Sequence, residues 1–193
     1  ARNIPRVHSC PVADLNAPVV QMLEKANAAN PEIAQRIIPD RVHPGAAGHL
    51  IMAGALLKSW GASGVVSVVE IDANTRRPAH LANTVVASLS GGADGGLTWS
   101  QVDNALPMPV DLSDAPTALA VKSGAFTGTL NQQTLKVANI TPGHYALRID
   151  GLQVKVFTAA ELAAGLDLTA LPTPMLKQAN AVHTLTLKRT GIH

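Results

Sequence analysis

The chain has 193 residues, with 15 lysines and arginines against 13 aspartates and glutamates, so its formal net charge is only +2. That balance excludes the strong basic field of a dedicated nucleic-acid-binding protein. Hydrophobic residues make up 47% of the chain and charged residues 15%, which excludes global disorder, while the single cysteine excludes an internal disulfide and a cysteine zinc site.

The first third of the chain is predicted to form one short strand followed by helices. The strand is expected over residues 7–15, and a helix is expected from residue 18 to the Asn30-Pro31 stop. A short helix over 32–37 comes next. The clearest helix covers 46–60, with a glycine directly after it at the position where helices commonly end. This order is typical of the closing part of an α/β domain.

From residue 64 onward the pattern changes to short β-branched segments separated by turn residues. Strands are predicted over 65–71, 84–89, 118–121, 134–140, 145–149 and 152–157. Alternation in two of these segments indicates one buried and one exposed face, so we expect an antiparallel sheet or a small sandwich. The glycine-rich run 90–96 lacks the strand-to-helix frame of a phosphate-binding loop and is predicted to be a hairpin loop.

The last part of the chain returns to helix. Thr158 and Glu161 have the spacing of a capping box, and Gly165 is placed to end the short helix that follows. A second helix is predicted to begin at Thr173-Pro174. No apolar run reaches the about 18 residues that a membrane-spanning helix needs.

Asp40 and His43 form the pattern with the clearest chemical use. A carboxylate three residues before a histidine, on an irregular segment, can fold back and accept a hydrogen bond from one imidazole nitrogen. The other nitrogen is then left to take a proton from a nucleophile. Pro44 restricts His43 to an extended backbone, which holds its side chain at the start of the next helix. The pattern predicts a general base together with the acid that orients it.

The run Asp40-Arg-Val-His43-Pro-Gly-Ala-Ala-Gly48-His49, continued by Leu-Ile-Met-Ala, resembles the last motif block of the SGNH hydrolases, also called GDSL lipases and esterases. The resemblance covers about the first 60 residues. It implies a serine-type carboxylic-ester hydrolase with a flavodoxin-like, three-layer α/β domain, in which His43 is the base and Asp40 orients it. It implies no metal or organic cofactor, and it slightly favours an exported protein, periplasmic or extracellular.

The nucleophile of such an enzyme has no counterpart in this chain. Members of the family carry the serine in a Gly-Asp-Ser block, and oxyanion donors in later blocks, all upstream of the Asp-x-x-His loop. No Gly-Asp-Ser occurs here, and Ser9, the one serine before Asp40, has no such context. We therefore expect this chain to be inactive alone. We also expect it to be the C-terminal part of a larger esterase, cut before Ala1, whose N-terminal part is a companion chain or is lost.

Three parts follow from this interpretation. Residues 1–62 are predicted to close the hydrolase domain, 63–157 to form a β-rich antiparallel module, and 158–193 to form a helical return segment. One strand and three helices cannot close an α/β sheet, so the apolar faces around Val19 and Leu50 are expected to need the missing strands as cover.

Other interpretations stay open for the same residues. Asp40 can cap a turn and His43 the helix after it. Asp40, His43 and His49 match no familiar zinc spacing, so no metal is expected. On the enzyme interpretation the partner is a small ester, such as an acetylated carbohydrate, with no nucleic acid and no membrane span. The alternative function is a non-catalytic module that binds glycan or protein, in which Trp99 either stacks on a sugar or lies in the core.

Overall fold

The computed structural model describes residues 12–92 and 95–191. The chain folds as two compact units, each built from two separate stretches of sequence: residues 1–64 with 110–130, and residues 65–109 with 131–193. The mixture of helices and sheets agrees with the predicted α/β class. Most of the strand predicted over 7–15 lies outside the described residues, as does Ser9, and residues 12–15 have no regular structure.

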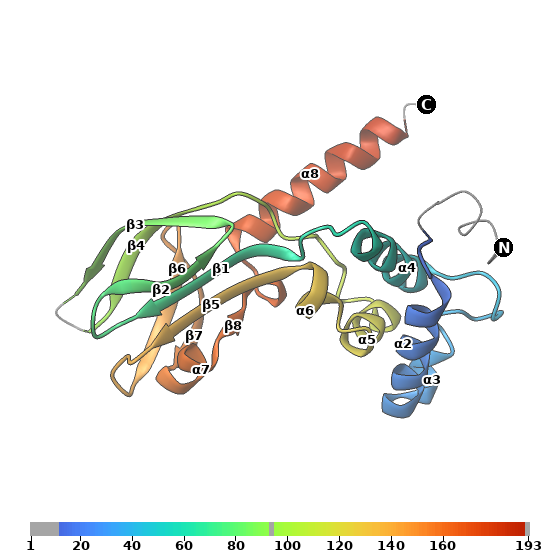
Figure 1. Ribbon diagram of the computed structural model, residues 1–193, viewed down its shortest axis with the longest axis horizontal. Coiled ribbons are helices and arrows are strands. Elements are labelled where there is room, and N and C mark those ends of the chain that lie inside the picture. Colours follow the sequence, from blue (N-terminus) through green and yellow to red (C-terminus); the bar gives the residue numbers. More distant parts are fainter. Residues whose placement is uncertain (1–11, 93–94, 192–193) are drawn as a thin grey trace. The chain divides into compact units, whose positions relative to one another are not determined.

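The described part of the first unit is entirely helical (Figure 1). Its helices are α2 (Asn16–Ala29), α3 (Pro31–Ala34), α4 (Ala46–Ser59), α5 (Ala115–Ser123) and α6 (Phe126–Leu130). The Asn30 side chain accepts a hydrogen bond from the Ile33 backbone N–H at 3.0 Å, so the residue that ends α2 also caps α3. A flavodoxin-like three-layer sheet is therefore not seen in this unit, within residues 12–64 and 110–130.

Helices α5 and α6 pack in the core of the first unit. Strands outside this chain had been expected to cover the apolar faces of α2 and α4. The buried residues of this core are Val19, Met22, Ala26, Ile37, Ala47, Ile51, Ala120, Val121 and Phe126. Two glycines allow the helices to approach closely. A Cβ on Gly54 would lie 2.9 Å from Leu130 Cδ1, and one on Gly124 would lie 2.8 Å from Ile51 Cδ1. The apolar faces of α2 and α4 are thus covered from within the chain.

Helix α5 replaces the strand predicted over 118–121, which was wrong. A short apolar run cannot be assigned to strand or helix by periodicity alone. The deciding signal lies upstream, where the Asp114 side chain accepts a hydrogen bond from the Thr117 backbone N–H at 3.0 Å and Pro116 occupies the first turn.

The second unit contains three sheets and a C-terminal helix (Figure 1). Its elements are β1 (Val65–Asp72), β2 (Arg77–Ala82), β3 (Thr84–Gly91), β4 (Leu97–Asp103), β5 (Gln132–Ala138), β6 (His144–Ile149), β7 (Leu152–Thr158), α7 (Ala159–Ala164), β8 (Leu166–Asp167), the 3-10 turn η1 (Leu168–Ala170) and α8 (Pro174–Thr190). The largest sheet has the order β2-β1-β5-β8, and β3-β4 and β6-β7 form two hairpins.

Some features of these sheets were not predicted. Strands β1 and β5 pair in parallel, with Val69 opposite Leu135, whereas only antiparallel pairing was expected. A parallel pair needs a long crossover connection, and here the chain between the two strands is long enough to supply one. Strand β2 was missed because it contains Pro78, a residue that strands accept at a sheet edge, where β2 lies. Strand β4 was also missed.

Residues from all three sheets and from α7 form one apolar core. Its buried members are Val69, Ile71, Leu135, Val137, Phe157, Leu162, Leu166 and Leu168. Trp99 is partly buried, packs against this core and donates a hydrogen bond from Nε1 to Gln101 Oε1 at 3.0 Å. The capping box of Thr158 and Glu161 is present as predicted.

No helix among the described residues is long and apolar enough to cross a membrane.

Candidate functional site

The Asp40–His43 pair lies on the loop between α3 and α4, which is closed at its base by backbone hydrogen bonds. The Gly45 N–H donates to the carbonyl of Ile37 at 3.2 Å, and the Arg41 N–H donates to the carbonyl of Ile38 at 3.1 Å. Ile37 is fully buried and anchors one end of the loop in the helical core. Arg41 has a positive φ of 61°, which turns the chain between the acid and the histidine.

The two oxygens of Asp40 have separate partners. Oδ1 accepts hydrogen bonds from the backbone N–H groups of Val42 at 3.0 Å and His43 at 2.7 Å, which fixes the turn. Oδ2 lies 2.6 Å from His43 Nδ1, which fixes the imidazole ring. The side-chain contact predicted from the spacing of the two residues is therefore present.

These hydrogen bonds favour the ionised form of the acid and select the tautomer of the histidine. They lower the pKa of Asp40 from 3.8 to about 2, with the His43 backbone N–H as the largest cause, followed by the His43 side chain and the Val42 N–H. Asp40 is ionised at neutral pH and stays so in mild acid, and because a carboxylate can only accept, Nδ1 carries the shared proton. Nε2 of a neutral His43 then keeps its lone pair and can accept a proton.

The pair is open to solvent. The exposed fractions of the side chains are 84% for His43 and 53% for Asp40. Within residues 12–92 and 95–191, Nε2 of His43 has no hydrogen-bond partner, and no serine, threonine or cysteine side chain is bonded to the ring. The described part of the chain therefore holds a base and its orienting acid without a nucleophile beside them.

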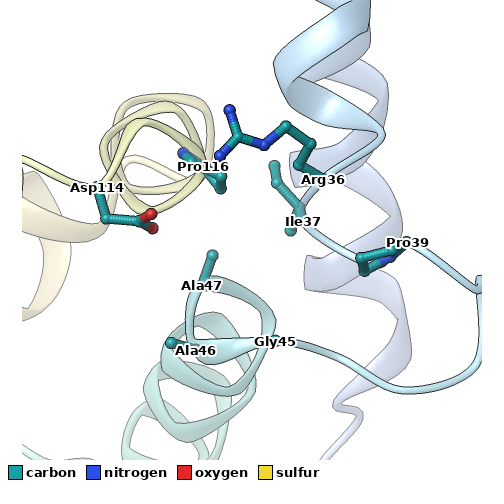
Figure 2. Close-up of a pocket in the computed structure, with 8 residues that line it drawn as sticks. All are labelled: Arg36, Ile37, Pro39, Gly45, Ala46, Ala47, Asp114 and Pro116. Atoms are coloured by element: carbon teal, nitrogen blue, oxygen red, sulfur yellow. The ribbon is translucent and has the colours of Figure 1, made fainter.

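A pocket of ≈ 430 Å³ lies next to this loop and within the same unit (Figure 2). Its lining residues are Arg36, Ile37, Pro39, Gly45, Ala46, Ala47, Asp114 and Pro116. Pro39 and Gly45 stand on either side of the Asp40–His43 segment, whereas His43 itself is not part of the lining. Figure 2 shows Arg36, from the turn after α3, and Asp114, at the start of α5, reaching the pocket from different elements.

Sequence reasoning missed the Asp114 side of this pocket. Asp114 and Pro116 lie more than 65 residues after the loop in the chain, beside a segment that was predicted to be a strand. The available signal was the Asp114-Ala-Pro116-Thr117 pattern of a helix start. Even that signal would have placed a helix without showing that it packs beside α4.

His49 makes no hydrogen bond or ion pair with Asp40 or His43 in the described part of the chain. It is exposed on α4, and its backbone N–H donates to the Gly45 carbonyl at 3.0 Å. In the part of the chain that the structure describes, no group of three histidine, cysteine, aspartate or glutamate side chains could hold a metal ion.

Comparison with known proteins identifies one informative solved structure. No protein-family profile matches the chain, and no curated protein matches it. The structure resembles that of BT4096, a gut microbial diltiazem-metabolizing enzyme, with a TM-score of 0.85 and 28% sequence identity over 97% of this chain. The chain spans 44% of BT4096, less than half of its length.

These findings correct the family assignment made from the sequence. Membership of the SGNH or GDSL hydrolases is wrong by this comparison, because no family profile matches and BT4096 is described only as a diltiazem-metabolizing enzyme. The ten-residue run that carried the resemblance is a turn capped by Asp40 and the first turn of α4, and such a local pattern does not specify a family. What the comparison supports is similarity to an enzyme.

Proposed function

We propose that this chain supplies His43 as general base, and Asp40 as its orienting acid, to a carboxylic-ester hydrolase. The observation that carries the proposal is the 2.6 Å contact between Asp40 Oδ2 and His43 Nδ1, which leaves Nε2 available for proton transfer. The similarity to BT4096 supports an enzymatic role. Diltiazem is itself an acetate ester, so hydrolysis of a short-chain ester is among the reactions open to an enzyme that metabolizes it.

In the proposed reaction, Nε2 of His43 takes the proton of a serine hydroxyl as the hydroxyl oxygen attacks the ester carbonyl carbon. Asp40 stays ionised and stabilises the imidazolium that forms. His43 then returns the proton to the alcohol oxygen as the bond between that oxygen and the acyl carbon breaks. Water, deprotonated by His43, hydrolyses the acyl-serine and restores the free hydroxyl.

The serine and the oxyanion donors are proposed to come from a companion chain or from a further part of the same protein. Two observations support this: BT4096 is more than twice as long as the matched chain, and His43 is 84% exposed, which leaves room for a second segment against Nε2. A small ester, including an acetylated carbohydrate, is the proposed substrate class.

The test is hydrolysis of 4-nitrophenyl acetate by the natural assembly, identified by intact mass as this chain with its companion or as one longer polypeptide. We expect no hydrolysis by the chain alone. In the assembly, His43→Ala should lower kcat by on the order of 10⁴-fold or more, and Asp40→Asn by on the order of 10⁴-fold.

The matched control is His49→Ala, because His49 is an exposed histidine on the neighbouring helix. It should leave kcat unchanged. Equal losses in the His43 and His49 variants, or full activity in His43→Ala, would exclude the proposed role of His43. An assembly that hydrolyses no acyl ester would exclude the ester-hydrolase function itself.

A further inference from the structure

We propose that Gly48 is a positioning residue for the Asp40–His43 pair. Because Gly48 has no side chain, Pro44 can pack directly against the first turn of α4. The catalytic meaning of this inference rests on the proposed function. The effect of Gly48 on the contacts between Asp40 and His43 can be tested without any substrate.

Gly48 is buried in the first turn of α4 and faces the loop that carries the pair. A Cβ added to Gly48 would lie 2.7 Å from Cβ of Pro44, closer than real Cβ atoms approach their neighbours. The same Cβ would meet Ile38 Cγ1 at 3.8 Å, an ordinary contact. The space at Gly48 is therefore filled by Pro44 on one side and bounded by Ile38 on the other.

Pro44 has little freedom to give way. The next residue, Gly45, donates its N–H to the Ile37 carbonyl at 3.2 Å, and a Cβ on Gly45 would lie 3.4 Å from that same carbonyl oxygen. Ile37 is fully buried, so this end of the loop is held against the helical core. A side chain at Gly48 would push Pro44 away from α4 and toward the rest of the loop.

Displacement of Pro44 reaches His43 directly, because the two residues share a peptide bond and proline restricts the backbone of the residue before it. The His43 N–H lies 2.7 Å from Asp40 Oδ1, and Nδ1 lies 2.6 Å from Oδ2. Both contacts depend on where the His43 backbone lies. The contact between Pro44 and Gly48 therefore holds the His43 backbone where both hydrogen bonds to Asp40 can form.

Two other glycines of the same unit provide matched controls. Gly54 lies on α4 as well, but a Cβ there would meet Leu130 and Phe126 instead of the loop. Gly128 lies in α6, where a Cβ would meet nothing within 4 Å. Gly54→Ala thus disturbs the packing of α4 without touching Pro44, and Gly128→Ala disturbs neither.

The experiment is NMR on the whole chain. The readouts are the carboxyl ¹³C titration of Asp40 and the Nδ1–H signal of the His43 imidazole, with thermal unfolding as the measure of folding. In Gly48→Ala, the pKa of Asp40 should move from about 2 toward 3.8, and the Nδ1–H signal should be lost. Gly54→Ala and Gly128→Ala should leave both readouts as in the parent chain, even if Gly54→Ala lowers the Tm.

A second variant, Pro44→Gly, removes the other half of the contact and adds nothing to the helix. It should shift the Asp40 titration in the same direction, which keeps the test decisive if Gly48→Ala does not fold. An unchanged Asp40 pKa in a folded Gly48→Ala chain, or in Pro44→Gly, would overturn the inference. Loss of hydrolysis is not among the readouts, so failure of the proposed function would leave this result standing.

Discussion

At the scale of single residues, the informative feature is how Asp40 divides its two oxygens between backbone and ring. Oδ1 accepts two backbone N–H groups and Oδ2 holds the imidazole, all within four consecutive residues. This pairing could be predicted from the sequence because every partner is local. Asp114 on the pocket wall could not be predicted, because only tertiary packing brings α5 beside the loop.

The first prediction concerns the titration of Asp40. Its pKa of about 2 in the folded chain lies below the ordinary value of 3.8. A lowered pKa stabilises the fold above pH 3.8, and that contribution is lost as the pH falls through about 2. We therefore expect the His43 Nδ1–H signal to persist at pH 3 and to disappear near pH 2.

Carboxyl ¹³C NMR of the chain, with Asp40→Asn to assign the signal, measures this titration. A midpoint near 3.8 would contradict the hydrogen-bonded turn.

At the scale of elements, the helices around the site were easier to predict than the strands and helices further along the chain. Helices near 18–30 and 46–60 are observed as α2 and α4, because apolar residues recur at helical spacing and the predicted stops at Asn30 and Gly61 are in place. The segment 118–121 was assigned to the wrong class because four apolar residues fit either structure. Its helix start at Asp114 was the better guide.

The prediction at the scale of elements concerns Asp114 at the N-terminus of α5. Asp114 accepts hydrogen bonds from the Thr117 N–H at 3.0 Å and the Thr117 hydroxyl at 2.7 Å. Asp114→Ala should lower the free energy of unfolding by about 1 kcal/mol, because an N-terminal donor of α5 loses its partner. Urea denaturation followed by circular dichroism measures the change.

Asp111→Ala is the control, since Asp111 accepts hydrogen bonds from the Ser113 N–H and hydroxyl in the preceding loop and does not bond to Thr117 in the described part of the chain. Equal effects of the two substitutions would argue against a capping role for Asp114.

At the scale of the whole molecule, each unit is assembled from two stretches of sequence. The division predicted from composition, into 1–62, 63–157 and 158–193, followed the change of pattern along the chain. Composition shifts mark where strands replace helices, but they do not show that residues 110–130 fold with the first 64. That association depends on burial of Ala120 and Phe126 against α2 and α4, which no local pattern encodes.

The corresponding prediction is that deletion of residues 1–62 unfolds α5 and α6. Phe126 and Ala120 would lose the helices that bury them, so proteases should cut the shortened chain within 110–130 and spare the same segment in the full chain. Mass spectrometry of the fragments locates the cuts. The core around Leu135 and Phe157 should stay protected in both, and equal protection of 110–130 would refute the prediction.

The split of the helical unit also has a consequence for protein synthesis. Helices α2 and α4 leave the ribosome before α5, and about 55 residues of sheet-forming chain are made between α4 and α5. At about 5–20 residues per second, this leaves Val19, Met22 and Ile51 uncovered for several seconds in each nascent chain. During that interval the apolar face that later becomes a core is open to chaperones and to other nascent chains. The core of the first unit can therefore be completed only after α5 and α6 have been made.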